Sequence, residues 1–348
     1  MKFSFSTHGW DGYDFKTLVA AAEESGLQGI EIANAQCIEF SENDGPLNKH
    51  NLAATVRDLR AKGLQIPCVN AGTDFASEGS CDIAEKEILK RIEMAKSLSV
   101  PFVTLYASPN GNAKIAEETI GKVLPYAEKA GITLLVKTTG LFSNTAELKA
   151  LLDTFANDYL GASWDFHSPY QKFHEDPETT IKNLGAYVKH VQVRDSIVKD
   201  GRSTFALIGE GELPIPAFVS CLASINYDGF LSLRWDPDWL PGLTDLDVIL
   251  THYITTIRRY GSTSRKRSYL YKNRAKTGEY VWKHDDLIDL TFPQVLDKMV
   301  DEFPDQLAFK YTTLDYTRTY SEFRDDVDRF ARTLIALGVK RGSKVAIW

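Results

Sequence analysis

Cysteine is scarce in this chain of 348 residues, and the cysteines present form no recognisable pattern. Cys37, Cys68, Cys81 and Cys221 contain no CxxC pair and have no histidine at zinc-ligand spacing. The alternatives are disulfides or a structural zinc site, and the scattered positions favour neither. The sequence therefore predicts reduced thiols, partly buried in strands, as in a cytoplasmic protein.

Long apolar runs and an excess of positive charge are also absent. No stretch approaches the roughly 18 consecutive apolar residues that a membrane-spanning helix needs. The N-terminal segment MKFSFSTHGWDGYDF is interrupted by polar residues too early for a signal peptide. The net charge of -7 gives no overall attraction to nucleic acid or to anionic lipid. We therefore expect a cytoplasmic protein with neither a nucleic-acid nor a membrane partner.

What the sequence does contain is a regular alternation of short apolar runs with helical patterns. The predicted strands are residues 2–7, 29–34, 66–72, 102–108, 132–138, 160–166, 188–194 and 230–236. Gly26, Gly63 and Gly131 stand where helix C-caps are expected before the next strand. Eight such repeats in about 256 residues predict an α/β fold, the (β/α)8 TIM barrel. The alternative is an open doubly wound sheet, which typically has GxGxxG after its first strand, where this chain has HGWDGYD.

The composition of the sequence changes after the last repeat. Residues 261–284 carry seven Lys or Arg and a single acid without helical or strand periodicity, which predicts a basic linker. Binding of a phosphate-rich ligand is the alternative for this run. We expect domains at 1–260 and 285–348, the second being a small α/β segment in the order helix, strand, helix, strand. Because the sequence stops inside an expected buried strand at Trp348, we expect this segment to be truncated and the natural protein to continue.

Chemistry in a TIM barrel is carried at the C-terminal ends of the strands, where side chains from different strands converge. The polar residues at or near these ends are His8, Glu31, Asn70, Tyr106, Lys137, Asp165, Gln192, Arg194 and Arg234. In the sixth run, WDFHSPY, Asp165 and His167 are two residues apart, so an extended strand would place both on one side. The sequence thus predicts a single pocket at this end of the barrel.

Residues 1 to about 258 resemble the xylose isomerase-like TIM barrels, the group of sugar and sugar-phosphate isomerases and epimerases. The resemblance is carried by AAAEESGLQGIEI, WDFHSPY, VKHVQVRDS and IGEGELPIPAFVSCLASINYDGFLSLRW. It implies one divalent cation (Mn, Mg, Co or Zn), held by Glu, Asp, His and Glu after strands five to eight. Those positions hold Lys137, Asp165, Gln192 and Arg234 here, so only the aspartate is kept. His167 resembles the first histidine of the family's WDxHHPY variant, and Ser168 stands in place of the second.

These replacements reverse the charge of the expected pocket. Two carboxylates become cations, and unit charges near 4 Å interact by about 4 kcal/mol at an effective dielectric constant of 20. One carboxylate and one amide are too few ligands for a dedicated cation site. We therefore expect no metal and no other cofactor in this chain, although the scaffold is that of metal-dependent enzymes.

Three functional hypotheses follow. In the first, an isomerase- or epimerase-like barrel acts on an anionic, sugar-like small molecule without metal, with Asp165, His167 and Lys137 as catalytic residues. Its substrate-binding residues are His8, Glu31, Asn70, Tyr106, Gln192, Arg194 and Arg234. In the second, the barrel is a non-catalytic binding or scaffold domain whose old metal site is filled by ion pairs. In the third, Lys137 is an amine nucleophile that forms a Schiff base. The family resemblance also allows a homodimer.

Residues 290–348 carry a second resemblance. TFPQVLDKMVDEFPDQLAFKY and TYSEFRDDVDRFARTLIALGVKRGSKVAIW are similar to the opening of AMP-forming acyl-CoA synthetases. The resemblance implies an AMP-dependent ligase whose phosphate loop and adenylate-binding residues lie beyond Trp348, so ATP is expected only in that missing portion. It also implies a barrel that handles or supplies a carboxylic acid. An unrelated α/β fragment is the alternative.

Overall fold

A computed structural model describes residues 1–10, 12–33, 45–199, 201–240, 242–243, 245–262, 290–311, 316–340 and 342–345. Contacts between residues divide the chain into two units, Met1–Gly261 and Ser262–Trp348. Most of the expected linker, 263–284, and the thiol of Cys37 lie outside the described residues. Cys68, Cys81 and Cys221 are free thiols, as expected. Within the described part of the chain, no helix is long and apolar enough to cross a membrane.

The first unit is built on eight parallel strands, and each contains or overlaps one of the predicted runs. They are β1 (Lys2–Ser6), β2 (Gly29–Glu31), β3 (Cys68–Asp74), β4 (Phe102–Tyr106), β5 (Thr133–Lys137), β6 (Leu160–Asp165), β7 (Val188–Val193) and β10 (Phe230–Leu233). Their order is β2-β1-β10-β7-β6-β5-β4-β3. Parallel bridges from Gly29 to Gln65 and from Ile32 to Val69 connect the two ends. The TIM barrel prediction is confirmed, and the doubly wound alternative is wrong.

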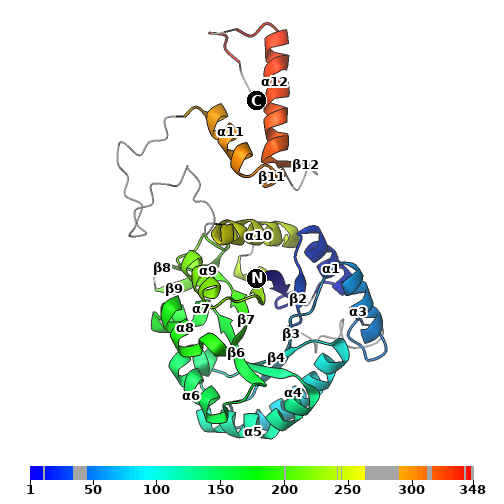
Figure 1. Cartoon of the computed structure of the whole chain (residues 1–348), viewed down its shortest axis with the longest axis vertical. Coiled ribbons are helices and arrows are strands. Elements are labelled where there is room, and N and C mark those ends of the chain that lie inside the picture. Colours follow the sequence, from blue (N-terminus) through cyan, green and yellow to red (C-terminus); the bar gives the residue numbers. More distant parts are fainter. Residues whose placement is uncertain are drawn as a thin grey trace. The chain divides into compact units, whose positions relative to one another are not determined.

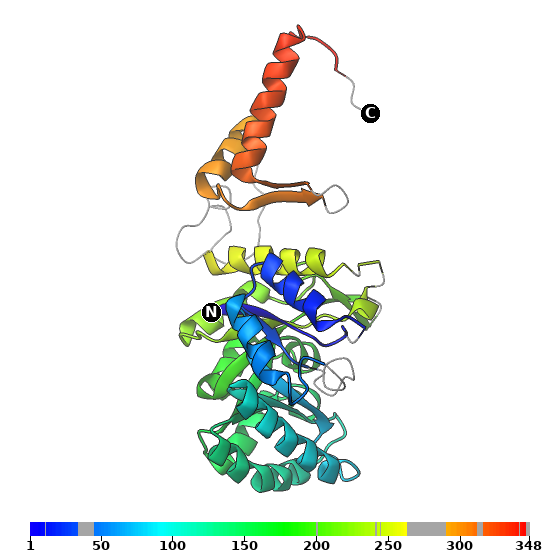
Figure 2. The same cartoon turned by 90° about the vertical axis from the view of Figure 1, so that its right-hand side faces the viewer.

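Helices surround this barrel on the outside (Figure 1). They are α1 (Phe15–Glu24), α3 (Leu52–Ala61), α4 (Cys81–Leu98), α5 (Ala113–Ala130), α6 (Thr145–Phe155), α7 (His167–Phe173), α8 (Pro177–Leu184), α9 (Ile215–Ser224) and α10 (Leu246–Ser262). Figure 2 shows the barrel from the side, with α1 and α10 along its outer surface. Gly131 ends α5 in the left-handed conformation that the sequence predicts for a C-cap.

The hydrophobic core lies between the strands and the helices. Because side chains alternate along a strand, one set faces the helices and the other faces the barrel interior. Phe5, Val136 and Trp164 belong to the core cluster, whereas the next residue along β5, Leu135, is buried but lies outside it. The interior positions include the buried polar groups Ser4, Glu31, Thr104, Ser163, His190 and Gln192. The interior is therefore polar, unlike the branched aliphatic filling common in this fold.

A β-hairpin that the sequence analysis missed follows β7 at the C-terminal end of the barrel. Its strands, β8 (Asp195–Lys199) and β9 (Arg202–Ala206), pair in antiparallel fashion, with Lys199 opposite Arg202. The two residues between them are Asp-Gly in the sequence, a strong signal for a two-residue hairpin turn. The hairpin therefore lies at the end of the barrel where the pocket is expected.

The second unit contains α11 (Phe292–Glu302), β11 (Leu307–Tyr311), β12 (Tyr316–Thr319) and α12 (Tyr320–Ala336). The predicted helix, strand and second helix occur in that order, with one short strand that was not predicted, β12, which pairs with β11 before the second helix. The expected final strand at Trp348 lies partly outside the described residues. Capping boxes begin both helices, at Thr291 and at Thr319. No side chain is buried in the described part of either helix.

Candidate active site

Glu31 is the centre of a hydrogen-bond network inside the barrel. Its fully buried carboxylate accepts from Ser6 Oγ at 3.3 Å and from Gln192 Nε2 at 2.5 Å. Nε2 of His190 lies 2.9 Å from its other oxygen. Burial alone would raise the pKa of Glu31, but the His190 hydrogen bond and the charges of His190 and Lys137 outweigh it and lower the pKa to about 2. This network joins β1, β2 and β7, and sequence reasoning missed His190.

Asp165 ends β6 and is fully buried. Its Oδ1 accepts from the backbone N–H groups of His167 at 3.1 Å and Ser168 at 2.9 Å, at the start of α7. Arg194 Nε lies 3.2 Å from Oδ2, an ion pair whose alignment is too poor for a hydrogen bond. Burial opposes ionisation of Asp165, yet the charges of Arg194 and Arg234 lower its pKa to about 2. The carboxylate is therefore charged but already partnered.

His167 does not share a strand face with Asp165, so this geometric prediction is wrong. β6 ends at Asp165, and His167 is the first residue of α7. Its ring nitrogen Nε2 lies 2.9 Å from Ser196 Oγ, in the hairpin strand β8. Burial lowers the pKa of His167 to about 4, and the charge of Arg194 adds to the effect. The imidazole is neutral at pH 7.

His8 and His167 make stability depend on pH. Burial lowers the pKa of each from 6.5 to about 4, so between these values the unfolded chain binds protons that the folded chain does not. The free energy of unfolding is therefore expected to fall as the pH drops from 6.5 towards 4. Between pH 7 and about 4.5, the decrease in the free energy of unfolding should be about 2 kcal/mol smaller in His167→Asn than in the wild type. Urea unfolding at the two pH values measures this difference. An unchanged pH dependence in this variant would contradict the burial of the ring.

Lys137 and Arg234 are the two cations of the predicted pocket. Lys137 is the last residue of β5 and keeps only 6% of its surface exposed. Within the described part of the chain, its amine has no hydrogen bond and no carboxylate within 4.0 Å. Burial lowers the pKa of Lys137; the charge of Glu31 opposes this, and that of Arg234 adds to it.

Arg234 follows β10 and is largely buried. Its NH2 lies 3.2 Å from Nε2 of His8. Burial and the charge of Arg194 lower the pKa of Arg234 to about 10, so the guanidinium stays protonated at neutral pH. The same groups influence His8, whose pKa is lowered to about 4 by burial and then by the charges of Arg234 and Lys137. His8 and Arg234 are thus in contact, and Lys137 lies near enough for its charge to act on His8.

Two aromatic residues that sequence reasoning missed cover Arg194. The guanidinium carbon lies 5.4 Å from the ring centre of Phe205, in β9, and 5.8 Å from that of Trp239, in the 3-10 helix Pro237–Trp239. The two rings are stacked with centroids 3.8 Å apart. Cation–π contact favours Arg over these faces and shields the Asp165–Arg194 pair from water. The Asp-Gly hairpin signal was the available clue to Phe205.

Asp195 holds the base of the hairpin. Its buried carboxylate accepts from four backbone N–H groups. The donors are Ser196, Gly209, Gly211 and Leu213. They tie β8 to the segment that precedes α9. The aromatic cover over the site depends on this anchor.

Asp195→Ala is expected to lower the free energy of unfolding by about 4 kcal/mol, because buried N–H donors lose a charged acceptor. Thermal or urea unfolding measures the change. Asp153→Ala is the matched control, since Asp153 is exposed and should shift stability by less than about 1 kcal/mol. Equal effects of the two substitutions would count against the anchoring role.

Asn70 and Tyr106 are less closely connected to the charged group. Asn70 lies within β3, which continues to Asp74, and its side chain accepts from the N–H of Gly72. Tyr106 ends β4 and is 36% exposed. No hydrogen bond or ion pair joins either side chain to Asp165, Lys137 or Arg234 in the part of the chain that the structure describes.

Glu31, Cys68 and His190 offer ligand atoms within 4.8 Å of one another, all buried. This set is nevertheless a poor cation site. The Glu31 carboxylate is already bonded to His190 and Gln192. Burial raises the pKa of the Cys68 thiol well above its ordinary value, so the thiolate that a metal needs is disfavoured. The cluster is better explained as a hydrogen-bond network.

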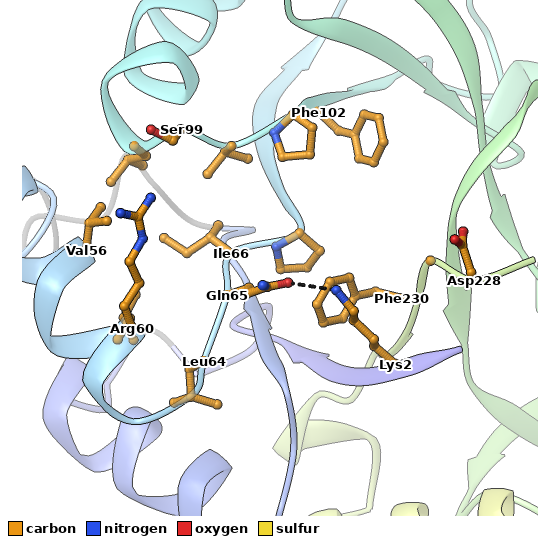
Figure 3. Close-up of a pocket in the computed structure, with 16 residues that line it drawn as sticks. Lys2, Val56, Arg60, Leu64, Gln65, Ile66, Ser99, Phe102, Asp228 and Phe230 are labelled. Carbon is orange, nitrogen blue, oxygen red and sulfur yellow. Dashed lines mark hydrogen bonds between the residues drawn. The ribbon is translucent and has the colours of Figure 1, made fainter.

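A pocket of about 450 Å³ lies at the opposite, N-terminal end of the barrel (Figure 3). Lys2 donates to Gln65 Oε1 there at 3.1 Å and lies over the ring of Phe230. Pro67, Pro101 and Phe102 supply apolar lining. In TIM barrels this face serves stability, because catalytic groups project from the other end.

Two family sequence models match the chain. Residues 19–248 match the one described as xylose isomerase-like TIM barrel, and residues 296–348 match that of AMP-binding enzymes. The mitochondrial medium-chain acyl-CoA ligase ACSF2 of Danio rerio is 34% identical over 58 residues, which are 17% of this chain. The aligned part spans only 10% of that curated relative.

Solved structures resemble the first unit. The IOLI protein with a binding zinc atom gives a TM-score of 0.65 at 16% identity, over 77% of this chain and 100% of that one. The probable 3-DHS dehydratase AsbF from Bacillus anthracis gives 0.60 at 16% identity, over 77% and 100%. A D-allulose 3-epimerase from Methylomonas sp. gives 0.58 at 16% identity, over 75% and 98%. At such identities the likeness shows the fold.

Proposed function

This chain belongs to the xylose isomerase-like TIM barrel family, and we propose that its barrel binds an anionic, sugar-like small molecule without a divalent cation. One observation carries the proposal. Arg234 is largely buried and protonated, yet within the described residues no carboxylate lies within 4.0 Å of its guanidinium, and its NH2 contacts the neutral His8 at 3.2 Å. An anionic ligand group would supply the missing partner.

A divalent cation does not fit the four positions where the family resemblance places its ligands. Asp165 is held by Arg194 and by two backbone N–H groups. Lys137 and Arg234 would repel a cation, and Gln192 offers one amide oxygen, Oε1, which has no hydrogen-bond partner among the described residues. One free amide oxygen and one occupied carboxylate are too few for Mg²⁺, Mn²⁺ or Zn²⁺. No chemical step is therefore assigned to a metal.

Further polar groups suited to a hydroxylated ligand are buried in the barrel. Among the residues that the structure describes, the hydroxyls of Ser4, Thr104 and Ser163 and the amide oxygen Oε1 of Gln192 have no hydrogen-bond partner. Arg234 presents a planar fork that matches a carboxylate or phosphate. Structural neighbours named as D-allulose 3-epimerase and L-ribulose 3-epimerase favour a sugar-like ligand.

Among the three residues expected to be catalytic, Lys137 is the best placed. Asp165 is neutralised by Arg194, and the His167 ring is bonded to Ser196. Among the described residues the Lys137 amine has no such partner, so it is available for proton transfer or bonding to a ligand. A non-catalytic binding barrel is the second candidate function, because the ion pair of Asp165 with Arg194 and its two backbone N–H donors favour a structural role for that carboxylate.

The attached segment supports a separate proposal. Residues 296–348 match AMP-binding enzymes, and we infer that the full protein carries an AMP-forming ligase beside the barrel. ATP would bind only in that ligase.

Calorimetric titration tests the barrel proposal. In the presence of EDTA, inorganic phosphate, glucose 6-phosphate and gluconate are expected to bind, whereas neutral glucose is not. Added Mn²⁺ should leave these affinities unchanged. Binding that requires Mn²⁺, or glucose binding as tightly as its phosphate, would overturn the proposal.

A further inference from the structure

We propose that Lys137 binds its ligand covalently, its ε-amine forming an imine with the carbonyl group of a small oxo acid whose anionic group is held by Arg234. The inference rests on the proposed function and narrows its ligand to a molecule with both a carbonyl and an anionic group.

The first argument is the position of the amine. Lys137 follows Leu135 by two residues on β5, so both side chains project into the barrel interior rather than into the outer core. The charges of Glu31, Arg234 and Asp165 all act on Lys137. The amine therefore lies near enough to charged residues of three other strand ends to feel their charges, Arg234 among them.

The second argument is the lack of an ion pair. Buried lysines are ordinarily paired, because an unpaired buried ammonium is costly. Within the described residues, Lys137 has no carboxylate within 4.0 Å and no hydrogen bond. Burial favours its neutral amine, which is the nucleophilic form. Arg234 cannot take this role, since a guanidinium stays protonated.

Exposed lysines provide the contrast. Lys62, Lys122 and Lys149 each lie within 4.0 Å of a carboxylate, at Glu23, Glu85 and Asp153. Their ion pairs favour the charged ammonium; the pKa of Lys122, for example, is raised by its hydrogen bond to Glu85. The chain thus contains both an amine suited to addition and matched amines that are not.

The chemistry needs no oxidant or reductant. The neutral Nζ attacks the carbonyl carbon and forms a C–N bond, giving a carbinolamine after proton transfer to the oxygen. Loss of that oxygen as water, with a proton from nitrogen, breaks the C–O bond and leaves the imine. Addition of water reverses both steps.

Reductive trapping tests the proposal. The full chain is incubated with glyoxylate, which carries an aldehyde and a carboxylate, and with sodium cyanoborohydride, which reduces the imine to a stable secondary amine. Peptide mass spectrometry then gives the labelling rate of each lysine. Lys137 should be labelled about tenfold faster than Lys122 or Lys149.

Four comparisons give the test its controls. Inorganic phosphate should slow labelling of Lys137 alone, and Arg234→Gln should do the same. Lys137→Arg should abolish the fast label, and Lys149→Arg should change neither the labelling of Lys137 nor phosphate binding by calorimetry.

The two proposals fail differently. If phosphate binds but Lys137 is labelled no faster than the exposed lysines, the imine is overturned and the anion site stands. If Lys137 is labelled rapidly but neither phosphate nor Arg234→Gln affects the rate, the assigned role of Arg234 is overturned. If no anion binds and Lys137 is not labelled, both proposals fail.

Discussion

Arg234→Met is expected to lower the affinity of the barrel for glucose 6-phosphate by about 100-fold, because truncating one partner of a buried charge pair costs several kcal/mol. The guanidinium is largely desolvated before the ligand arrives, so little hydration remains to be lost on binding. Its pKa is lowered by burial and by Arg194, which means that the folded barrel disfavours this charge. An incoming anion relieves that cost.

The same reasoning predicts the stability of the variant. Without ligand, the free energy of unfolding of Arg234→Met should equal or exceed that of the wild type. The substitution removes a buried charge that Arg194 repels. Calorimetry and urea unfolding measure the two quantities. Arg60→Met, at the opposite end of the barrel, is the matched control and should leave the affinity unchanged. Unchanged affinity in Arg234→Met would rule out the proposed anion contact.

The second large effect is a gain of metal binding. The combined variant Lys137→Glu, Gln192→His and Arg234→Glu should bind Mn²⁺ or Zn²⁺ with a dissociation constant of about 10 μM or tighter. It places two carboxylates and an imidazole beside Asp165, the set that the family resemblance implies. Arg194 still contacts Asp165 and limits the affinity. The wild type is expected to show no saturable binding at these concentrations.

Calorimetry with each cation measures this gain. A variant with Arg60→Glu and Lys149→Glu changes the net charge equally through exposed side chains and should bind neither cation with this affinity. Cation binding by the wild type as tight as by the combined variant would show that the cationic residues do not exclude a metal. The metal-free proposal would then be wrong.

The sequence was sufficient for the barrel because its signals are local and repeated. Each strand is a short β-branched run, and each is followed by a helical period, so the errors at individual ends did not change the fold. The pocket followed from the fold, since C-terminal strand ends converge whatever their residues. Lys137 and Arg234 could therefore be placed together without knowing any contact.

Contacts between distant strands could not be predicted in the same way. Glu31 and His190 are 159 residues apart, and their pairing depends on the register of the strand contacts β2–β1, β1–β10 and β10–β7. The prediction continued the strand through WDFHSPY, past the end of β6 at Asp165. Asp165 accepts the first N–H groups of α7, and Pro169 near the helix start was the signal that the strand had ended.

In this barrel, the residues that stabilise the fold and the residues available to a ligand lie on opposite faces of the strands. Packing between strands and helices depends on outward residues such as Phe5, Val136 and Trp164, and these are the neighbours in sequence of the residues that face the ligand space. A change at Lys137 therefore alters chemistry while its flanking residues keep the architecture intact. Such a division makes the inner surface tolerant of substitution, so that one scaffold accommodates successive, even oppositely charged, ligand specificities.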